Sequence, residues 1–138
     1  MKLTKPNLLI TDDDRAFRET LRSVLDRFDF EMYLAEDGEE ALEIISRHQV
    51  HLALFDVHMP RLSGLEALTR MRASGLSLPC ILMSAALDEA ICDAASKLED
   101  VSVIPKPLKI REISSVVTHL LAKRYGWQAE SPAVDRPK

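Results

Sequence analysis

The chain has little cysteine and no long apolar run, and these shortages exclude several classes of protein. Its 138 residues include only two cysteines, Cys80 and Cys92, so we expect neither a disulfide framework nor a cysteine-based metal site. No apolar run approaches the roughly 20 residues that a membrane-spanning helix needs. The first residues, MKLTKPNLLITDDD, turn acidic after a short apolar run, unlike a secretory signal. We therefore expect a cytoplasmic protein that does not enter a membrane.

An excess of positive charge is also lacking. The formal net charge is −4, and the basic residues are scattered along the chain rather than gathered in one stretch. Because non-specific nucleic-acid binding needs a basic face, we expect no direct nucleic-acid partner. The apolar share of 46% and the charged share of 29% are typical of a folded soluble domain. The length suits one such domain.

Short apolar runs alternate with stretches of helical periodicity, a pattern typical of βα units around a parallel sheet. The predicted strands are 8–10, 31–35, 52–55, 80–83 and 101–104. The predicted helices are about 15–28, 41–48, 65–71, 90–98 and 113–121, and Asp14 is expected to cap the first of them. These units form a domain over 1–124. The segment 125–138, with two prolines and no apolar period, is expected to be a flexible tail or linker.

Polar side chains stand where the predicted strands end. The residues concerned are Asp12 and Asp13, Asp56, Ser84 and Lys106. Each of them alone has an ordinary explanation as a turn or strand-end residue. Ligands of an open parallel sheet bind at the carboxyl ends of its strands, so the topology would bring all five together. Their convergence is the specific signal.

A cluster of carboxylates at this edge needs a cation. Two carboxylates about 5 Å apart repel each other by roughly 3 kcal/mol at an effective dielectric constant near 20. Oxygen ligands in a partly hydrated site suit Mg²⁺, which usually takes one or two carboxylates, water and phosphate oxygens. A carboxylate can attack phosphorus and form an aspartyl phosphate, while the metal and a lysine neutralise the transferring group. Phosphoryl transfer is therefore the predicted chemistry.

Four stretches, LLITDDD, LALFDVHMPRLSGLEAL, ILMSA and VIPKPL, resemble the ordered motifs of the bacterial two-component response-regulator receiver domain. The resemblance covers about residues 6–122. It implies a flavodoxin-like (βα)5 fold, with a doubly wound parallel five-stranded sheet in the order 2-1-3-4-5. It also implies a phosphoacceptor signalling domain rather than an enzyme. Three forms stay open: a stand-alone chemotaxis-type regulator, a phosphate shuttle, and the receiver portion of a larger regulator cut near Gly126.

The same resemblance assigns roles to the clustered residues. Asp56 would take the phosphoryl group from a sensor histidine kinase or a histidine phosphotransfer protein. Asp13 and Asp56 would bind Mg²⁺ directly with the backbone carbonyl of His58, and Asp12 would act through water. Ser84 would be the switch hydroxyl.

Two further features follow from the resemblance. Lys106 would pair with the phosphate, and the Lys106–Pro107 bond would be cis. A downstream protein would dock on the face formed by the fourth helix, the fifth strand and the last helix. A homodimer formed on phosphorylation is a further alternative.

Three departures from the family pattern affect the expected output. Val103 replaces the usual aromatic residue, so we expect signalling to rely on backbone shifts of residues 85–88 rather than on a side-chain flip. His58 is either an exposed loop residue or an imidazole that tunes hydrolysis, and Ala86 offers no polar group for that task. The stretch KLEDVSV lacks the usual glycine, so that helix end is either looser or closed by Asp100.

Three rival functions differ in what they require. A flavodoxin-like FMN carrier needs a phosphate-binding loop after the first strand, where this chain has three aspartates, and bound FMN would support it. A phosphatase of the haloacid-dehalogenase kind needs an acid two residues after the nucleophile, where this chain has His58, and turnover of a phosphomonoester would support it. A pseudo-receiver that is never phosphorylated would not need the acidic pair, acceptor, hydroxyl and lysine that are all present.

Overall fold

Five parallel strands form one sheet in the order β2-β1-β3-β4-β5, in a computed structural model that describes residues 3–86 and 88–129. The strands are β1 (Asn7–Thr11), β2 (Glu31–Ala35), β3 (Leu52–Asp56), β4 (Cys80–Ser84) and β5 (Val101–Pro105). The helices are α1 (Arg15–Leu25), α2 (Gly38–Arg47), α3 (Gly64–Ala73), α4 (Glu89–Ser96) and α5 (Ile110–Tyr125). This order confirms the predicted flavodoxin-like (βα)5 fold.

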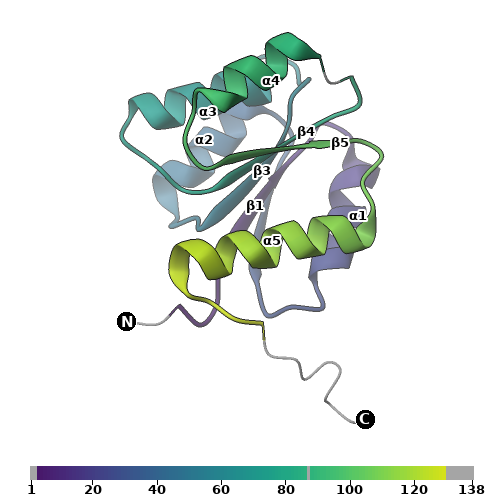
Figure 1. The fold of residues 1–138 in the computed structure, drawn as a ribbon, viewed down its shortest axis with the longest axis vertical. Coiled ribbons are helices and arrows are strands. Elements are labelled where there is room, and N and C mark those ends of the chain that lie inside the picture. The colour runs from purple at the N-terminus through teal and green to yellow at the C-terminus, as the bar shows by residue number, and fades with distance from the viewer. Residues whose placement is uncertain (1–2, 87, 130–138) are drawn as a thin grey trace.

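The sheet lies between two helical layers, with α1 and α5 on one face and α2, α3 and α4 on the other (Figure 1). Successive side chains of a strand point to opposite faces, so Leu8 and Ile10 pack with α1 and α5, while Leu9 packs with the other layer. Every residue of β3 is buried. A strand covered on both faces loses the apolar–polar alternation, which is why its apolar run is continuous.

Side-chain caps start four of the helices soon after the strands end. Asp14 caps α1, as predicted, and accepts hydrogen bonds from the backbone N–H groups of Ala16 and Phe17. Asp37 caps α2, Asp88 caps α4, and Ser63 forms a reciprocal capping box with Glu66 at α3. These caps fix where each connection leaves the carboxyl edge of the sheet.

The end of α1 differs from the prediction, and the segment between α4 and β5 shows which residue replaces the missing glycine. The first helix ends at Leu25, not at residue 28, because the chain turns and Phe28 packs against the Phe30 ring at 5.3 Å. Phe28 continues the apolar period although it is no longer helical. After α4, Asp100 adopts a left-handed backbone (φ 57°) just before β5, the conformation that glycine usually supplies.

The packed domain extends beyond the predicted boundary at residue 124. Helix α5 ends at Tyr125, whose hydroxyl donates a 2.6 Å hydrogen bond to the carbonyl of His51. The chain then turns at Gly126 (φ 70°), and Trp127 is buried with 5% of its surface exposed. Trp127 therefore belongs to the core, and Tyr125 anchors the end of α5 to it. The rest of the predicted tail, 130–138, lies outside the described residues.

None of the helices in the described part of the chain has both the length and the apolar character needed to cross a membrane.

Candidate functional site

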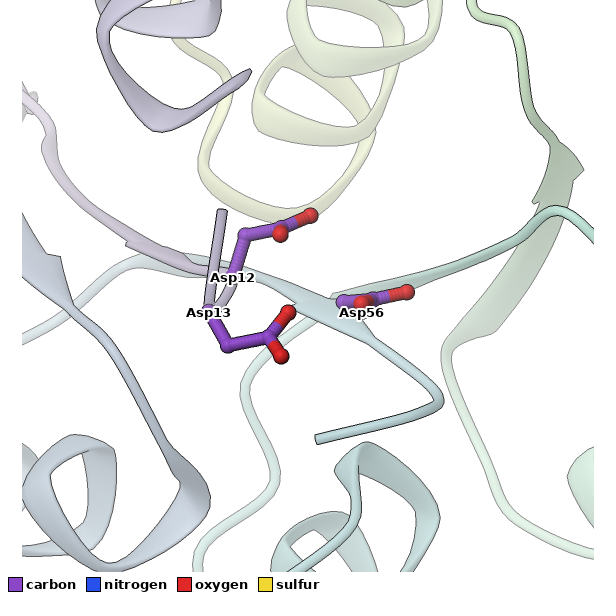
Figure 2. A group of neighbouring side chains, drawn as sticks. All are labelled: Asp12, Asp13 and Asp56. Carbon is purple, nitrogen blue, oxygen red and sulfur yellow. The ribbon is translucent and has the colours of Figure 1, made fainter. Parts of the chain in front are cut away.

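The predicted site residues meet at the carboxyl edge of the sheet. Asp12 and Asp13 directly follow β1, Asp56 is the last residue of β3, and Ser84 is the last residue of β4. Lys106 directly follows β5. Figure 2 shows the side chains of Asp12, Asp13 and Asp56 lying near one another at this edge. The topology thus joins residues that lie up to 94 positions apart in the sequence.

The three carboxylates lie close enough to share one cation. One oxygen from each of Asp12, Asp13 and Asp56 lies within 4.8 Å of the other two. Asp12 and Asp56 are buried and Asp13 is exposed, so the cluster opens to solvent on the Asp13 side. At that separation each pair of charges repels by about 3 kcal/mol at an effective dielectric constant near 20. The cluster is therefore built for a positive partner.

Lys106 supplies part of that positive charge. Its Nζ lies 2.7 Å from Asp12 Oδ2 and 3.4 Å from Asp56 Oδ1. Burial alone would lower the pKa of Lys106, but the hydrogen bond and charge of Asp12, helped by Asp56, raise it above its usual value. Lys106 is therefore a permanent cation at this site.

The pKa of Asp56 is raised as well, but in a carboxyl group this shift disfavours the charged form. Its burial raises the pKa of the carboxyl group, the charge of Asp12 raises it further, and Lys106 partly offsets both. Perturbed carboxyl groups of this kind concentrate at functional sites. Burial and the charge of Asp12 therefore disfavour the charged form of the predicted acceptor.

Ser84 makes hydrogen bonds to the loop that follows it and to the end of β5. The buried Ser84 hydroxyl oxygen accepts a hydrogen bond from the backbone N–H of Ala86 at 3.1 Å, and its carbonyl accepts from the N–H of Lys106 at 2.8 Å. The Lys106–Pro107 bond is cis, as the resemblance predicted. No hydrogen bond joins the Ser84 hydroxyl to Asp56 among the described residues. Ser84 therefore lies beside the acceptor without engaging it.

The loop after Asp56 holds residues that the sequence interpretation did not single out. Gly64 approaches the acceptor's backbone so closely that a Cβ there would lie 2.3 Å from the Asp56 carbonyl oxygen. Arg61, in a left-handed conformation (φ 67°), donates to the buried cap Asp37, with Nη2 3.1 Å from its Oδ2. The hydrogen bond from the Glu40 backbone N–H lowers the pKa of Asp37 below its usual value, and Arg61 lowers it further. Only the motif HMPRLSG hinted at this packing.

The donor set fits a magnesium ion. All three carboxylates offer hard oxygen atoms, which Mg²⁺ prefers, and the exposed Asp13 leaves room for water. The side chain of His58 is exposed, and among the described residues no hydrogen bond uses its backbone carbonyl. An oxygen ligand is thus available next to the acceptor.

Comparisons with known proteins identify the family that the chain resembles. The family model "Response regulator receiver domain" matches residues 8–118. Response regulator MprA from Mycobacterium sp. (strain KMS) is 35% identical over 118 residues, which is 84% of this chain and 50% of that protein. The chain therefore spans about half the length of the curated relatives it matches.

Solved structures show the same fold. The receiver domain of the Francisella response regulator 1452 superposes with a TM-score of 0.78 at 25% identity, covering 86% of this chain and 98% of that one. A CheY-like receiver domain protein from Methanospirillum hungatei JF-1 has a TM-score of 0.81 at 22% identity, covering 87% and 96%. The second likeness is evidence for the fold alone.

The chain belongs to the response regulator receiver domain family. Membership of this family connects it with two-component signal transduction, in which receiver domains work with histidine kinases and effector domains.

Proposed function

We propose that this domain is a Mg²⁺-dependent phosphorylation switch whose acceptor is Asp56. One observation carries the proposal: the carboxylates of Asp12, Asp13 and Asp56 converge within 4.8 Å, and Lys106 contacts two of them. A nucleophilic carboxylate beside a permanent cation and a set of hard oxygen ligands is what acyl phosphate formation requires.

In the proposed reaction an oxygen of Asp56 forms a bond to phosphorus as the bond from phosphorus to the donor breaks. The leaving group keeps the electron pair of that bond, and a phosphohistidine donor whose other ring nitrogen carries a proton departs as neutral imidazole. Lys106 pairs with an oxygen of the incoming group and limits the build-up of negative charge. Bound Mg²⁺ would neutralise the carboxylates and the phosphoryl oxygens at the same edge.

Hydrogen bonding supports a division of labour among the magnesium ligands. Both oxygens of Asp12 already have partners, since Oδ1 accepts from the Asp14 N–H at 2.9 Å and Oδ2 holds Lys106. Within the described residues Asp13 has no such side-chain bond. Asp13 and Asp56 are therefore the proposed direct ligands, with the His58 carbonyl, and Asp12 the ligand that acts through water.

Ser84 is the proposed switch hydroxyl. It sits at the end of β4 next to the acceptor strand, and its present partner is the N–H of Ala86. Turning the hydroxyl toward a phosphoryl group would release that N–H and move the loop 85–88, of which residue 87 lies outside the described residues. Phosphorylation shifts such an equilibrium only by its differential stabilisation of the two states. With Val103 at the usual aromatic position, this loop is the proposed carrier of the signal.

We propose two kinds of protein partner for this domain, a phosphodonor and a downstream protein. A sensor histidine kinase or histidine phosphotransfer protein would donate the phosphoryl group in the cytoplasm, and a downstream protein would bind the α4–β5–α5 face. Ile110, at the start of α5, is 61% exposed, an apolar contact point for such a partner. A phosphorylation-dependent homodimer through the same face is the alternative.

The test is phosphorylation by a small phosphodonor with Mg²⁺, followed by intact mass measurement. We expect the wild type to gain one phosphoryl group, and Asp56→Ala to gain none. Asp29→Ala, which removes an exposed carboxylate outside the site, is the matched control and should behave as the wild type. Failure of the wild type to gain mass would favour a pseudo-receiver, and a gain by Asp56→Ala would place the acceptor elsewhere.

The rate at which the protein loses its phosphoryl group distinguishes the two roles left open for His58. If only its backbone carbonyl is used, His58→Ala loses the phosphoryl group at the wild-type rate. If the imidazole tunes hydrolysis, the rate changes and depends on pH in the range where histidine titrates.

A further inference from the structure

Lys106 has a neighbour that the phosphorylation chemistry alone does not explain. Its Nζ lies 4.1 Å from the centroid of the Phe17 ring. Phe17 is in the first turn of α1, with its backbone N–H bonded to the cap Asp14, and its side chain packs on the core cluster under α1 and α5. The ring is therefore held by the fold, and the flexible lysine reaches it.

The ring contacts the ammonium group in a setting that favours attraction. An ammonium over the face of an aromatic ring is attracted by the ring quadrupole, and the attraction grows as water is excluded. The Lys106 side chain is only 18% exposed. Two carboxylates and one ring therefore hold its charge, through Asp12, Asp56 and Phe17.

A bound magnesium ion would compete with Lys106 for two of these three contacts. Asp56 and Asp12 belong to the set of carboxylates that would bind magnesium, and a second cation there repels Lys106. The Phe17 ring takes no part in that set. Its hold on the ammonium group is therefore the one contact that a cation among the carboxylates leaves unchanged.

We propose that Phe17 is a positioning residue for Lys106, which holds the ammonium group at the end of β5 beside the acceptor. This inference rests on the proposed function, since the position matters because Lys106 pairs with the transferring group. A lysine side chain has a flexible stem of four carbons and loses much conformational entropy when it is fixed. By fixing the ammonium group in advance, the ring reduces the conformational entropy that Lys106 loses when the phosphodonor binds. A leucine would fill the space but has no quadrupole.

The test compares Phe17→Leu with Phe17→Tyr, which keeps the ring, and with Phe28→Leu as a matched control. Phe28 packs on the same core cluster but contacts Phe30 and Trp127 instead of Lys106. At saturating Mg²⁺ and fixed phosphoramidate, we expect Phe17→Leu to be phosphorylated about fivefold more slowly. Phe17→Tyr and Phe28→Leu should stay within about twofold of the wild type.

Two readouts separate positioning from general damage to the site. In metal-free protein, the ring should shift the NMR signals of the Lys106 side-chain methylenes upfield, and this shift should vanish in Phe17→Leu and persist in Phe17→Tyr. The Mg²⁺ dissociation constant should be the same in Phe17→Leu and wild type, because the ligands are untouched.

Several results would overturn the proposal: equal rates for Phe17→Leu and wild type, a Phe17→Tyr variant as slow as Phe17→Leu, or unshifted Lys106 signals in the wild type. A Mg²⁺ affinity weakened as much as the rate would show a merely structural role. If the wild type itself is not phosphorylated, the proposed function fails, whereas the metal-free signals still report whether the ring holds Lys106.

Discussion

Removing Trp127 should cost the domain much of its stability, although the residue lies beyond the boundary suggested by the sequence. The indole is 5% exposed and packs against two rings, with centroid distances of 5.3 Å to Phe30 and 6.4 Å to Phe28. Gly126 provides the left-handed turn after which the indole packs in the core cluster that α1 and α5 cover. The perturbation is Trp127→Ala, and a chain ending at residue 124 removes the same contact.

The expected loss follows from the area that the indole buries. An aromatic side chain buries about 150–250 Å², which at roughly 25 cal/mol per Å² corresponds to about 4–6 kcal/mol as an upper bound. Truncations of buried tryptophan to alanine cost about 3–5 kcal/mol. We therefore expect Trp127→Ala to lower the free energy of unfolding by about 4 kcal/mol. Domains of this kind have about 5–15 kcal/mol in total, so this is a large share.

The assay is urea unfolding followed by far-ultraviolet circular dichroism, since Trp127 is the only tryptophan and its fluorescence is lost in the variant. The midpoint should fall without a large change in slope. Gln128→Ala, at the exposed neighbouring position, is the control and should match the wild type. A loss below about 1 kcal/mol in Trp127→Ala would refute the conclusion that Trp127 belongs to the core.

Three further predictions concern other buried positions. Burial lowers the pKa of His51 below its usual 6.5, so its stabilising effect is complete above that pH and is lost as the pH falls through the folded-state pKa. Urea unfolding from about pH 7 to about pH 5 should therefore show a smaller loss for His51→Asn than for the wild type. Gly64→Ala should lower the free energy of unfolding by about 1–3 kcal/mol and slow phosphorylation, because its Cβ would displace the Asp56 carbonyl; unchanged stability and rate would contradict this. The buried Thr11 hydroxyl has no hydrogen-bond partner among the described residues, so Thr11→Val should raise the melting temperature and add about 1 kcal/mol, and a loss would contradict this.

Much of the fold was predictable because its signals are local. The continuous apolar run of β3 follows from its burial on both faces of a parallel sheet. The apolar residues at helical spacing follow from the burial of one face of each helix against that sheet. The end of the first helix was not predictable, since Phe28 keeps the apolar period while packing outside the helix. The burial of Trp127 depends on rings from distant parts of the chain. Neither periodicity nor composition reports such contacts.

The site was predictable for a different reason, which is topological. Once the strands were placed, the rule that ligands bind at their carboxyl ends brought Asp12, Asp56 and Lys106 together. The contacts around them were not predictable. In the sequence Phe17 looks like an ordinary helix residue and Gly64 like an ordinary loop residue, and only their distances to Lys106 and Asp56 give them a role.

The central claim is that Asp56 itself receives the phosphoryl group. The most direct measurement is to phosphorylate the wild-type protein with a small phosphodonor and Mg²⁺, digest it, and locate the modified residue by tandem mass spectrometry. The account predicts a single phosphoryl group on the peptide that contains Asp56, lost when Mg²⁺ is chelated before the donor is added. Modification of Asp12, Asp13 or a residue outside the site would contradict it.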